Sequence, residues 1–279
     1  MKVNWWVDGA ETDALPLDNR GLGYGDGLFE TMRALDGQIP LLDLHLSRLS
    51  RGAAALGLNV DLVVIKQRIN QSLNWVLETG WTQAVIKIVV IRSGFSDGYG
   101  YPEHSTSHDL IRATELLLPE NTSVLYSRIC KHVLSHQPVL AGLKHLNRLD
   151  QVIASSELEE EQEGLMLDSE GYIRDGISSN IFFVKGDEVS TPDLAGSGVR
   201  GVMRDYLISQ IGLIERFRFR ERSIHFSEIK DVDEVIFTNA IRGVRNAMSI
   251  KDEWASEQTE VGDQMRALLF NLSKGFISY

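Results

Sequence analysis

The first 118 residues alternate between strand-like and helix-like patterns of hydrophobic and polar side chains. Alternating or β-branched runs, which are typical of strands, occur at residues 3–8, 28–35, 83–92 and 113–118. Apolar side chains at helical spacing occur at residues 43–56 and 61–79. Asp61 supplies an N-cap for the second helix, and Gly57 and Gly80 follow the two helix ends. The pattern predicts a small sheet covered on one face by two helices.

The remaining residues predict a larger domain rich in hairpins. Strand patterns occur at residues 124–133, 165–167, 172–174, 181–184, 188–190, 235–238 and 244–250. Helical patterns begin near Asn147 and run to Glu163, and recur at residues 202–211 and 259–272. The polar segment 119–123 separates two apolar strands and is the best linker. We therefore expect two α/β domains with mixed sheets and hairpins, a small one at residues 1–118 and a larger one at residues 124–279.

Composition narrows the class of protein. A hydrophobic fraction of 43% and a charged fraction of 24% are typical of globular folds, and the net charge of −11 disfavours a nucleic-acid or anionic-membrane binder. Cys130 is the sole cysteine, which excludes an intrachain disulfide and a zinc-cysteine cluster. No run is apolar enough to span a bilayer, and the start reads as a strand rather than a signal peptide. We expect a cytoplasmic enzyme without a metal.

Lys144 is the first candidate for chemistry, because it lies just ahead of the helix predicted from Asn147. A desolvated lysine loses its proton near neutral pH, and the neutral amine condenses with an aldehyde to a Schiff base. The alternative is a solvated loop lysine. Lys144 alone, one of 28 lysines and arginines, would favour that alternative. The motifs that follow decide between the two.

Three downstream motifs accompany Lys144. They are Asp168-Ser-Glu-Gly-Tyr-Ile-Arg-Asp175-Gly-Ile-Ser-Ser-Asn180, Thr191-Pro192 and Gly196-Ser-Gly-Val-Arg-Gly201. With Lys144, they resemble the class IV, fold-type IV pyridoxal-phosphate enzymes over nearly the whole chain: branched-chain aminotransferases, D-amino-acid aminotransferases and 4-amino-4-deoxychorismate lyases. The segments Gly27-Leu-Phe-Glu-Thr-Met-Arg33, His45-x-x-Arg48-Leu49 and Leu143-Lys144-His-Leu-Asn-Arg-Leu-Asp are most similar to those of the lyases.

The resemblance implies the fold and the roles of several residues. The fold would be the two-domain, D-amino-acid aminotransferase-like architecture, with Lys144 in the larger domain as the residue that carries pyridoxal 5'-phosphate. Arg48, Thr238 and Asn239 match positions that contact the cofactor phosphate. Asp175 matches the acidic residue that pairs with the pyridine nitrogen, where relatives usually have glutamate; a turn aspartate before Gly176 is the alternative.

The spacing Gly196-x-Gly198-x-x-Gly201 also matches the dinucleotide fingerprint, so a nicotinamide or flavin dehydrogenase is a competing hypothesis. That fingerprint should follow the first strand of a βαβ unit, whereas here a Thr-Pro loop precedes it. The glycines nevertheless open a helix whose free N–H groups can hold one phosphate. Gly201 and Val202 are therefore candidates for a phosphate cradle.

The implied reaction is that of the lyases, which release pyruvate and 4-aminobenzoate through an external aldimine, a step of folate biosynthesis. A class IV aminotransferase acting on D-amino or branched-chain amino acids is the alternative, since the cofactor residues are shared. The arginine that lyases often carry in a Gly-Arg-Gly-Tyr loop is replaced by Tyr99, which is a candidate substrate-binding residue. Arg33, Arg242 or Arg245 could then hold the carboxylate of the small-molecule substrate. The resemblance also implies a homodimer in which residues 93–102 reach the partner's pocket.

Overall fold

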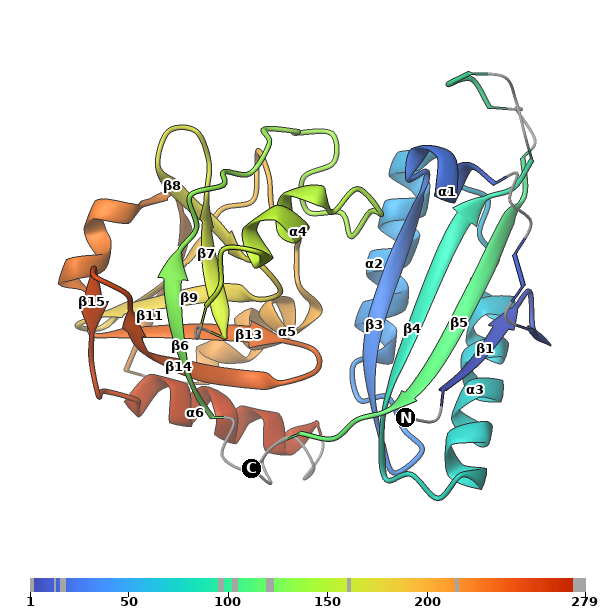
Figure 1. Cartoon of the computed structure of the whole chain (residues 1–279). Helices are drawn as coiled ribbons and strands as arrows, with labels where there is room; N and C mark the ends of the chain where they lie inside the picture. The colour runs from blue at the N-terminus through green and yellow to red at the C-terminus, as the bar shows by residue number, and fades with distance from the viewer. Residues whose placement is uncertain are drawn as a thin grey trace. The chain divides into compact units, whose positions relative to one another are not determined.

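The computed structural model describes residues 3–12, 14–15, 19–94, 98–101, 105–118, 123–159, 162–213 and 216–272. The chain divides into two compact units (Figure 1), Met1–Leu117 with Leu143–Asn147, and Leu118–Gly142 with Arg148–Tyr279. Of the predicted linker at residues 119–123, only Ser123 lies within the described residues. The assignment of Leu143–Asn147 to the first unit differs from the expectation that the lysine segment belongs to the larger domain.

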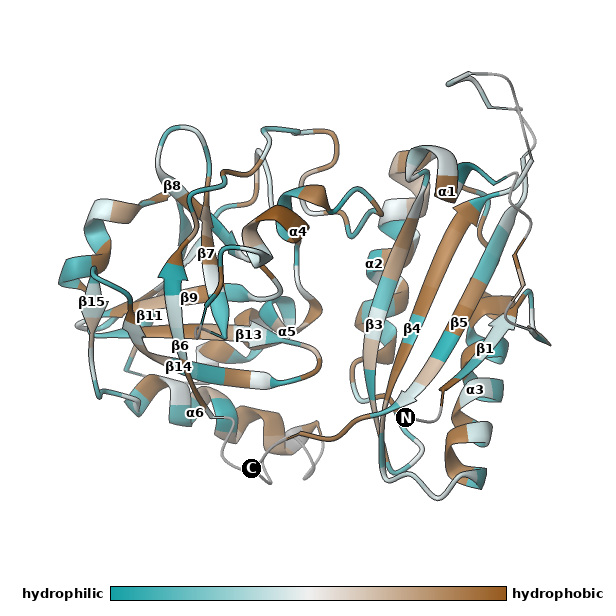
Figure 2. Ribbon diagram, viewed as in Figure 1, coloured by the Kyte–Doolittle hydropathy of each residue, from teal (hydrophilic) through white to brown (hydrophobic). Residues whose placement is uncertain are grey.

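The first unit is an antiparallel sheet with two helices on one face. Its strands are β1 (Val3–Val7), β2 (Ala10–Glu11), β3 (Gly27–Leu35), β4 (Gln83–Arg92) and β5 (Ser107–Glu115), in the order β2-β1-β5-β4-β3. Its main helices are α2 (Leu42–Leu56) and α3 (Leu62–Glu78). Leu49 of α2 and Ile69 of α3 pack with Met32 of β3 and Ile86 of β4 in one apolar core. Figure 2 shows hydrophobic residues along most of β4.

Local signals explain most of these boundaries. The Asp61 carboxylate accepts the N–H groups of Val63 and Val64, and Gly57 ends α2 in the left-handed conformation at φ 60°. The strand predicted at residues 113–118 was misplaced. It begins at Ser107, because pairing with β1 and β4 on its two sides extends it over polar residues. The short helix α1 (Arg20–Tyr24), capped by Asn19, has no clear trace in the hydrophobic pattern.

The second unit contains a ten-stranded mixed sheet. Its strands are β6 (Val124–Ile129), β7 (Glu163–Leu167), β8 (Tyr172–Gly176), β9 (Asn180–Lys185), β10 (Glu188–Pro192), β11 (Arg218–Arg222), β12 (Ile224–His225), β13 (Glu234–Asn239), β14 (Gly243–Ile250) and β15 (Trp254–Ala255). The order is β11-β10-β9-β13-β14-β6-β7-β8-β12, with β15 paired to β14. Only a short turn joins β8 to β9, although four strands lie between them in the sheet. The sheet therefore curls until these two strands meet.

This curl gives the sheet an inner and an outer face. Side chains of β6 to β9, β12, β13 and β14 fill the inner face with an apolar core that includes Leu165, Ile181 and Phe237. The helices α5 (Val202–Gln210) and α6 (Glu260–Leu268) contact β13, and the Glu234 carboxylate accepts the N–H of Val261 at the start of α6. The described residues of the unit also form three short 3-10 helices: η1 (Ile211–Leu213), η2 (Phe226–Asp231) and η3 (Leu269–Asn271). The two mixed α/β units confirm the predicted fold class.

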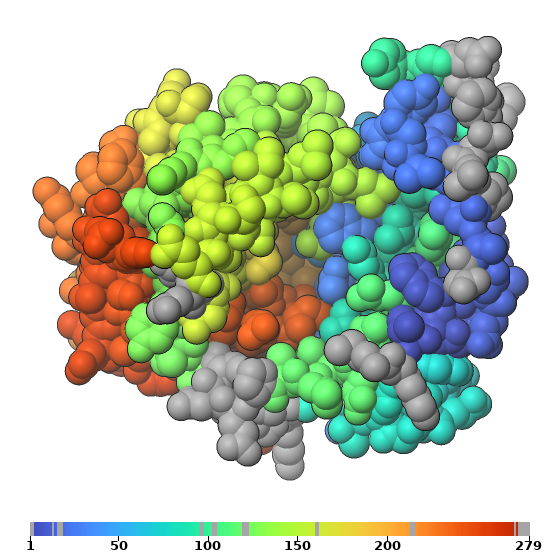
Figure 3. Space-filling model, in the orientation of Figure 1, coloured from blue at the N-terminus to red at the C-terminus, as the bar shows by residue number. Residues whose placement is uncertain are grey.

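The helix predicted from Asn147 to Glu163 was too long. The structure has only α4 (Leu149–Ser155), with Arg148 at its N-cap position, and Glu163 already begins β7. The side chain of Glu157 turns back to accept the N–H groups of Lys131 and His132, which ends the helical path. Figure 3 shows α4 at the surface of the second unit. No helix in the described part of the chain is long and apolar enough to cross a membrane.

Candidate active site

Lys144 is held in the first unit by an edge strand rather than by a helix entry. The Phe29 N–H donates to the Lys144 carbonyl at 2.9 Å, and the Leu146 N–H donates to the Gly27 carbonyl at 3.1 Å. The lysine segment therefore extends the small sheet beyond β3, which explains its place in the first unit. Lys144 Nζ lies 4.5 Å from the centroid of the Phe29 ring, which shields one side of the half-buried amine from water.

A buried cluster of Glu30, His45 and Arg48 is the second feature of this unit. Glu30 accepts hydrogen bonds from Arg48 Nε at 2.8 Å and Nη2 at 2.5 Å, and its Oε2 lies 2.7 Å from His45 Nδ1. Burial acts to raise the pKa of Glu30, but the charge and hydrogen bonds of Arg48 and His45 outweigh it and lower the pKa to about 2. Burial lowers the pKa of His45, and the positive charges of Arg48 and Lys144 add to this effect. The role of Arg48 as a phosphate ligand stays a prediction.

A second amine, that of Lys87, also lies close to the Phe29 ring. Lys87 Nζ lies 5.1 Å from the same ring centroid, and Lys87 is the register partner of Thr31 on β3. Burial and the neighbouring Arg112 charge lower the pKa of Lys87. The sequence pattern did not mark Lys87 as a site residue. The only sequence signal is that a lysine interrupts the apolar run of β4, because a strand buried on both faces would carry no charged residue.

Arg33 and Tyr99, two residues predicted to bind substrate, take different positions in the first unit. Arg33 is buried, and its Nη2 donates to Gln83 Oε1 at 2.7 Å. Tyr99 is 86% exposed, and its carbonyl accepts a hydrogen bond from Arg20 Nη2 at 3.0 Å. Arg20 also binds the carbonyl of Gly100 at 2.9 Å, so this arginine fixes the backbone of the loop while the Tyr99 side chain stays at the surface. Substrate binding by either residue stays a prediction.

In the second unit, the glycine loop at residues 196–201 leads directly into α5. The Val199 N–H donates to Asp175 Oδ2 at 2.9 Å, and Gly198 adopts φ 89°, a value that favours glycine. Gly201 is the N-cap residue of α5 and has no side-chain cap. A β carbon on Gly201 would collide with Asn180 Oδ1. The expected Thr-Pro loop before the glycines was wrong, because Thr191 and Pro192 end β10, and after α5 the strand β11 pairs in parallel with β10. The other neighbour of β10 is the antiparallel β9, unlike the mostly parallel sheet of a dinucleotide-binding fold.

Two buried hydroxyl groups show what this loop can hold. Among the described residues, Thr238 Oγ1 and Ser197 Oγ have no hydrogen-bond partner, although Thr238 is 1% exposed. Thr238 lies on the outer face of β13, opposite to the inward Phe237, and is the register partner of Asn180. An unpartnered buried hydroxyl costs free energy unless a ligand binds it. These hydroxyls and the uncapped α5 amides fit a phosphate group.

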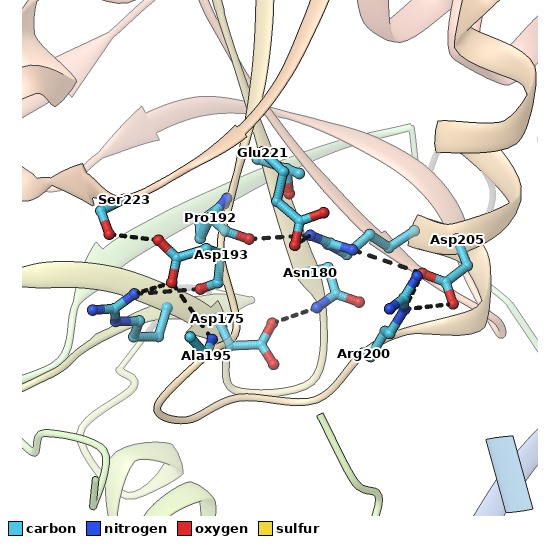
Figure 4. Close-up of polar contacts among 12 residues, drawn as sticks. Asp175, Asn180, Pro192, Asp193, Ala195, Arg200, Asp205, Glu221 and Ser223 are labelled. Carbon is cyan, nitrogen blue, oxygen red and sulfur yellow. Dashed lines mark hydrogen bonds and ion pairs between the residues drawn. The ribbon is translucent and has the colours of Figure 1, made fainter. Parts of the chain in front are cut away.

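Asp175 and Asn180 connect the glycine loop to the sheet (Figure 4). Asn180 Nδ2 donates to Asp175 Oδ1 at 2.9 Å and to the Val199 carbonyl at 2.7 Å. Asp175 is 6% exposed. The structure thus brings the predicted residues Asp175, Gly201 and Thr238 together around Asn180, a residue that the sequence pointed to only as a support.

The turn between β13 and β14 uses the side chain of Asn239 within the protein. Asn239 Oδ1 accepts the N–H groups of Ile241 at 3.0 Å and Arg242 at 2.7 Å, and its Nδ2 donates to Ser179 Oγ at 3.3 Å. The side chain of Arg242 is exposed. The phosphate contact of Asn239 and the substrate contact of Arg242 stay predictions. The described residues contain no group of three or more His, Cys, Asp or Glu side chains that could hold a metal ion.

Comparison with known proteins identifies the family. The model of the family "Amino-transferase class IV" matches residues 27–250. The chain is 27% identical to the aminodeoxychorismate lyase of Vibrio harveyi, with 96% of this chain and 99% of that protein aligned. It is 26% identical to the mitochondrial branched-chain-amino-acid aminotransferase 1 of Arabidopsis thaliana, with 92% and 72% aligned.

Among solved structures, the 4-amino-4-deoxychorismate lyase of Pseudomonas aeruginosa is 31% identical and superposes with a TM-score of 0.87. The superposition covers 96% of this chain and 98% of that one. The fold of this chain therefore has a counterpart over nearly the full length of that lyase structure. From the family match and this likeness together, the chain belongs to the class IV aminotransferase family.

Proposed function

We propose that this protein is a pyridoxal-phosphate-dependent 4-amino-4-deoxychorismate lyase, which releases pyruvate and 4-aminobenzoate. The observation that carries the proposal is similarity over more than nine-tenths of the chain to two lyases, at 27% and 31% identity. The segments around Glu30, Arg48 and Lys144, which resemble those of lyases more than those of transaminases, support the same choice.

The residues of the second unit suit the cofactor. The N–H groups of Gly201 and Val202 and the hydroxyl of Thr238 would hold the phosphate. Arg48, on α2 of the first unit, is proposed as a further ligand from the family resemblance alone. Asp175 would face the pyridine nitrogen and keep it protonated. When bound, the cofactor supplies an electron sink for the electron pair left on the substrate carbon after that carbon loses its proton.

The proposed roles of the chain's own residues follow from the reaction. Lys144 is the covalent attachment site between turnovers. During turnover its neutral amine takes the proton from the ring carbon that bears the substrate amine. It then gives the proton to the methylene carbon of the enolpyruvyl group as the bond between the ring and the ether oxygen of that group breaks, so that pyruvate leaves and the ring becomes aromatic. Both products are carboxylic acids, and we propose Lys87, beside the Phe29 ring, as one cation for a substrate carboxylate; Arg33 and Arg242 are further candidates.

A class IV aminotransferase is the second candidate function. The similarity to a branched-chain-amino-acid aminotransferase over 92% of the chain favours it. A transaminase needs the same lysine, phosphate ligands and acidic partner, so only the residues that contact the substrate separate the two activities.

The assay that tests the proposal offers 4-amino-4-deoxychorismate in one reaction and pairs of amino and keto acids in others. We expect release of 4-aminobenzoate and pyruvate without net transfer of an amino group. Borohydride reduction of the cofactor-loaded protein, followed by peptide mapping, should place the cofactor on Lys144, and Lys144→Ala should abolish both label and activity. Efficient transamination without 4-aminobenzoate would favour the second candidate, and the absence of bound cofactor would refute both.

The resemblance also supports two proposals about the whole molecule. We expect two copies of the chain to associate into a homodimer in the cytoplasm. Static light scattering of the purified protein tests the association, and a fully active monomer would contradict it.

A further inference from the structure

Two oppositely charged side chains lie inside the curled sheet of the second unit. Glu163 is 1% exposed and Arg245 is 4% exposed. Glu163 shares a face of β7 with Leu165, and Arg245 is the register partner of Phe237, so alternation places both charged side chains on the inner, apolar face. Arg245 Nη2 lies 3.7 Å from Glu163 Oε2. Because the burial of each charge costs free energy, the position of this pair inside the apolar core requires an explanation.

The Glu163 carboxylate holds the turn that joins β8 to β9. Its Oε2 accepts hydrogen bonds from Ser178 Oγ at 2.7 Å and Ser179 Oγ at 2.6 Å, and its Oε1 accepts the Ser178 N–H at 3.1 Å. Hydrogen bonds to an ionised carboxylate are roughly twice as strong as those between neutral groups. The turn also packs closely on it, because a β carbon on Gly176 would lie 3.4 Å from Glu163 Cδ.

The residues on either side of this turn are those that shape the glycine loop. Asp175 precedes the turn and Asn180 follows it, and their side chains are joined by a hydrogen bond of 2.9 Å. Val199 of the glycine loop donates to Asp175 and accepts from Asn180. With the Gly176 N–H bonded to the Ser179 carbonyl at 2.7 Å, the turn is too short to absorb a shift at one end. A change at Ser178 or Ser179 is therefore transmitted to both flanking side chains.

We propose that Glu163 and Arg245 are positioning residues for this site. Glu163 fixes the turn, and thereby the Asp175 carboxylate and the Asn180 amide, while Arg245 places a positive charge beside Glu163 inside the sheet. Only the effect on bound cofactor rests on the proposed function.

Arg245 is the counter-charge of the buried carboxylate at residue 163. Among the described residues, Arg245 is the only basic side chain within ion-pair distance of Glu163. Burial lowers the pKa of Arg245 to about 10, against the opposing effect of Glu163, so the guanidinium remains charged at neutral pH. Without it, the Glu163 carboxylate would lie inside the sheet with no opposite charge beside it, which is costly.

The test compares the full-length protein with Glu163→Gln and with the double variant Glu163→Gln, Arg245→Gln. Glu234→Gln is the matched control, since Glu234 is also a buried carboxylate of this unit and accepts the N–H groups of Val261 at 2.9 Å and Gly262 at 3.1 Å. Three quantities are measured for each: the thermal midpoint, amide hydrogen exchange of residues 176–199 in cofactor-free protein, and the dissociation constant for pyridoxal 5'-phosphate.

We expect Glu163→Gln to speed exchange in the turn and at Val199, and to weaken cofactor binding by about tenfold or more, because small displacements of site groups are costly. The double variant should regain thermal stability, since it lacks an uncompensated guanidinium, but keep the fast exchange and weak binding. The Glu234→Gln variant should have a lower thermal midpoint, while its exchange at residues 176–199 and its cofactor affinity should stay at wild-type values.

Recovery of wild-type exchange and affinity in the double variant would show that the pair is only structural and would overturn the proposal. If the wild type binds no pyridoxal 5'-phosphate, the proposed function fails, while the exchange data still decide the positioning role. Should Glu163→Gln not fold, Ser178→Ala with Ser179→Ala removes two donors to the same carboxylate. Unchanged exchange at Val199 in that variant would refute the proposal.

Discussion

Replacement of Glu30 by glutamine tests whether charge in the Glu30, His45 and Arg48 cluster stabilises the first unit. Glutamine has nearly the same size, so the variant removes a negative charge with little change in packing. It takes away the carboxylate that Arg48, only 5% exposed, contacts with two nitrogen atoms. Breaking a buried ion pair by removing one partner typically costs about 3–5 kcal/mol.

The pKa of Glu30 gives an independent figure for the same effect. A carboxyl group whose pKa falls from an ordinary 4.5 to about 2 on folding contributes about 3 kcal/mol of stability at neutral pH. This contribution is fully present above pH 4.5 and is lost as the pH falls towards 2, where the folded state must also bind the proton. His45, whose pKa is lowered by burial, acts in the same direction and loses its contribution as the pH falls below 6.5.

Tryptophan fluorescence makes the measurement specific to the first unit. Four of the five tryptophans lie there, namely Trp5, Trp6, Trp75 and Trp81. Urea unfolding followed by fluorescence gives the free energy of unfolding from neutral pH down to about pH 3. We expect Glu30→Gln to be about 3 kcal/mol or more less stable than the wild type at neutral pH, and the two curves to converge in acid.

Glu78→Gln is the control, because Glu78 is an exposed glutamate on α3 of the same unit. It removes the same charge without touching a buried partner, and its stability curve should follow that of the wild type. A Glu30→Gln curve that runs parallel to the wild type at every pH would refute the assignment of this stability to the ionised carboxylate.

Three further predictions concern the second unit. Thr238→Val removes a buried hydroxyl that has no partner among the described residues, so it should keep or raise the thermal midpoint of the cofactor-free protein yet weaken pyridoxal 5'-phosphate binding about tenfold in a titration. Gly201→Ala should displace Asn180 and weaken cofactor binding by a similar factor, whereas Gly212→Ala, with open space around the new methyl group, should not. Asp175→Asn should lower turnover about a hundredfold in the lyase assay. The amide carries no charge, and its N–H groups would face the N–H donors of Asn180 and Val199. Wild-type turnover in this variant would show that Asp175 is only a turn residue.

The sequence by itself determined the parts of this protein that local chemistry specifies. The helical period and the glycine and aspartate caps placed α2 and α3 within one residue of their observed bounds. The motifs at residues 168–201 indicated the class IV family, which the family model confirmed. These signals work because periodicity, capping and a short motif all involve residues that are neighbours along the chain.

Tertiary structure alone decided how distant segments pair. The segment around Lys144 pairs with β3 because the Lys144 carbonyl accepts a hydrogen bond from the Phe29 N–H. No local sequence pattern predicts that partner. Glu163 was read as the end of a helix, but as the first residue of β7 it lies inside a curled sheet beside Arg245. A strand's partners and the curvature of a sheet depend on all the strands at once, so the burial of a charge and its counter-charge appear only when the chain is folded.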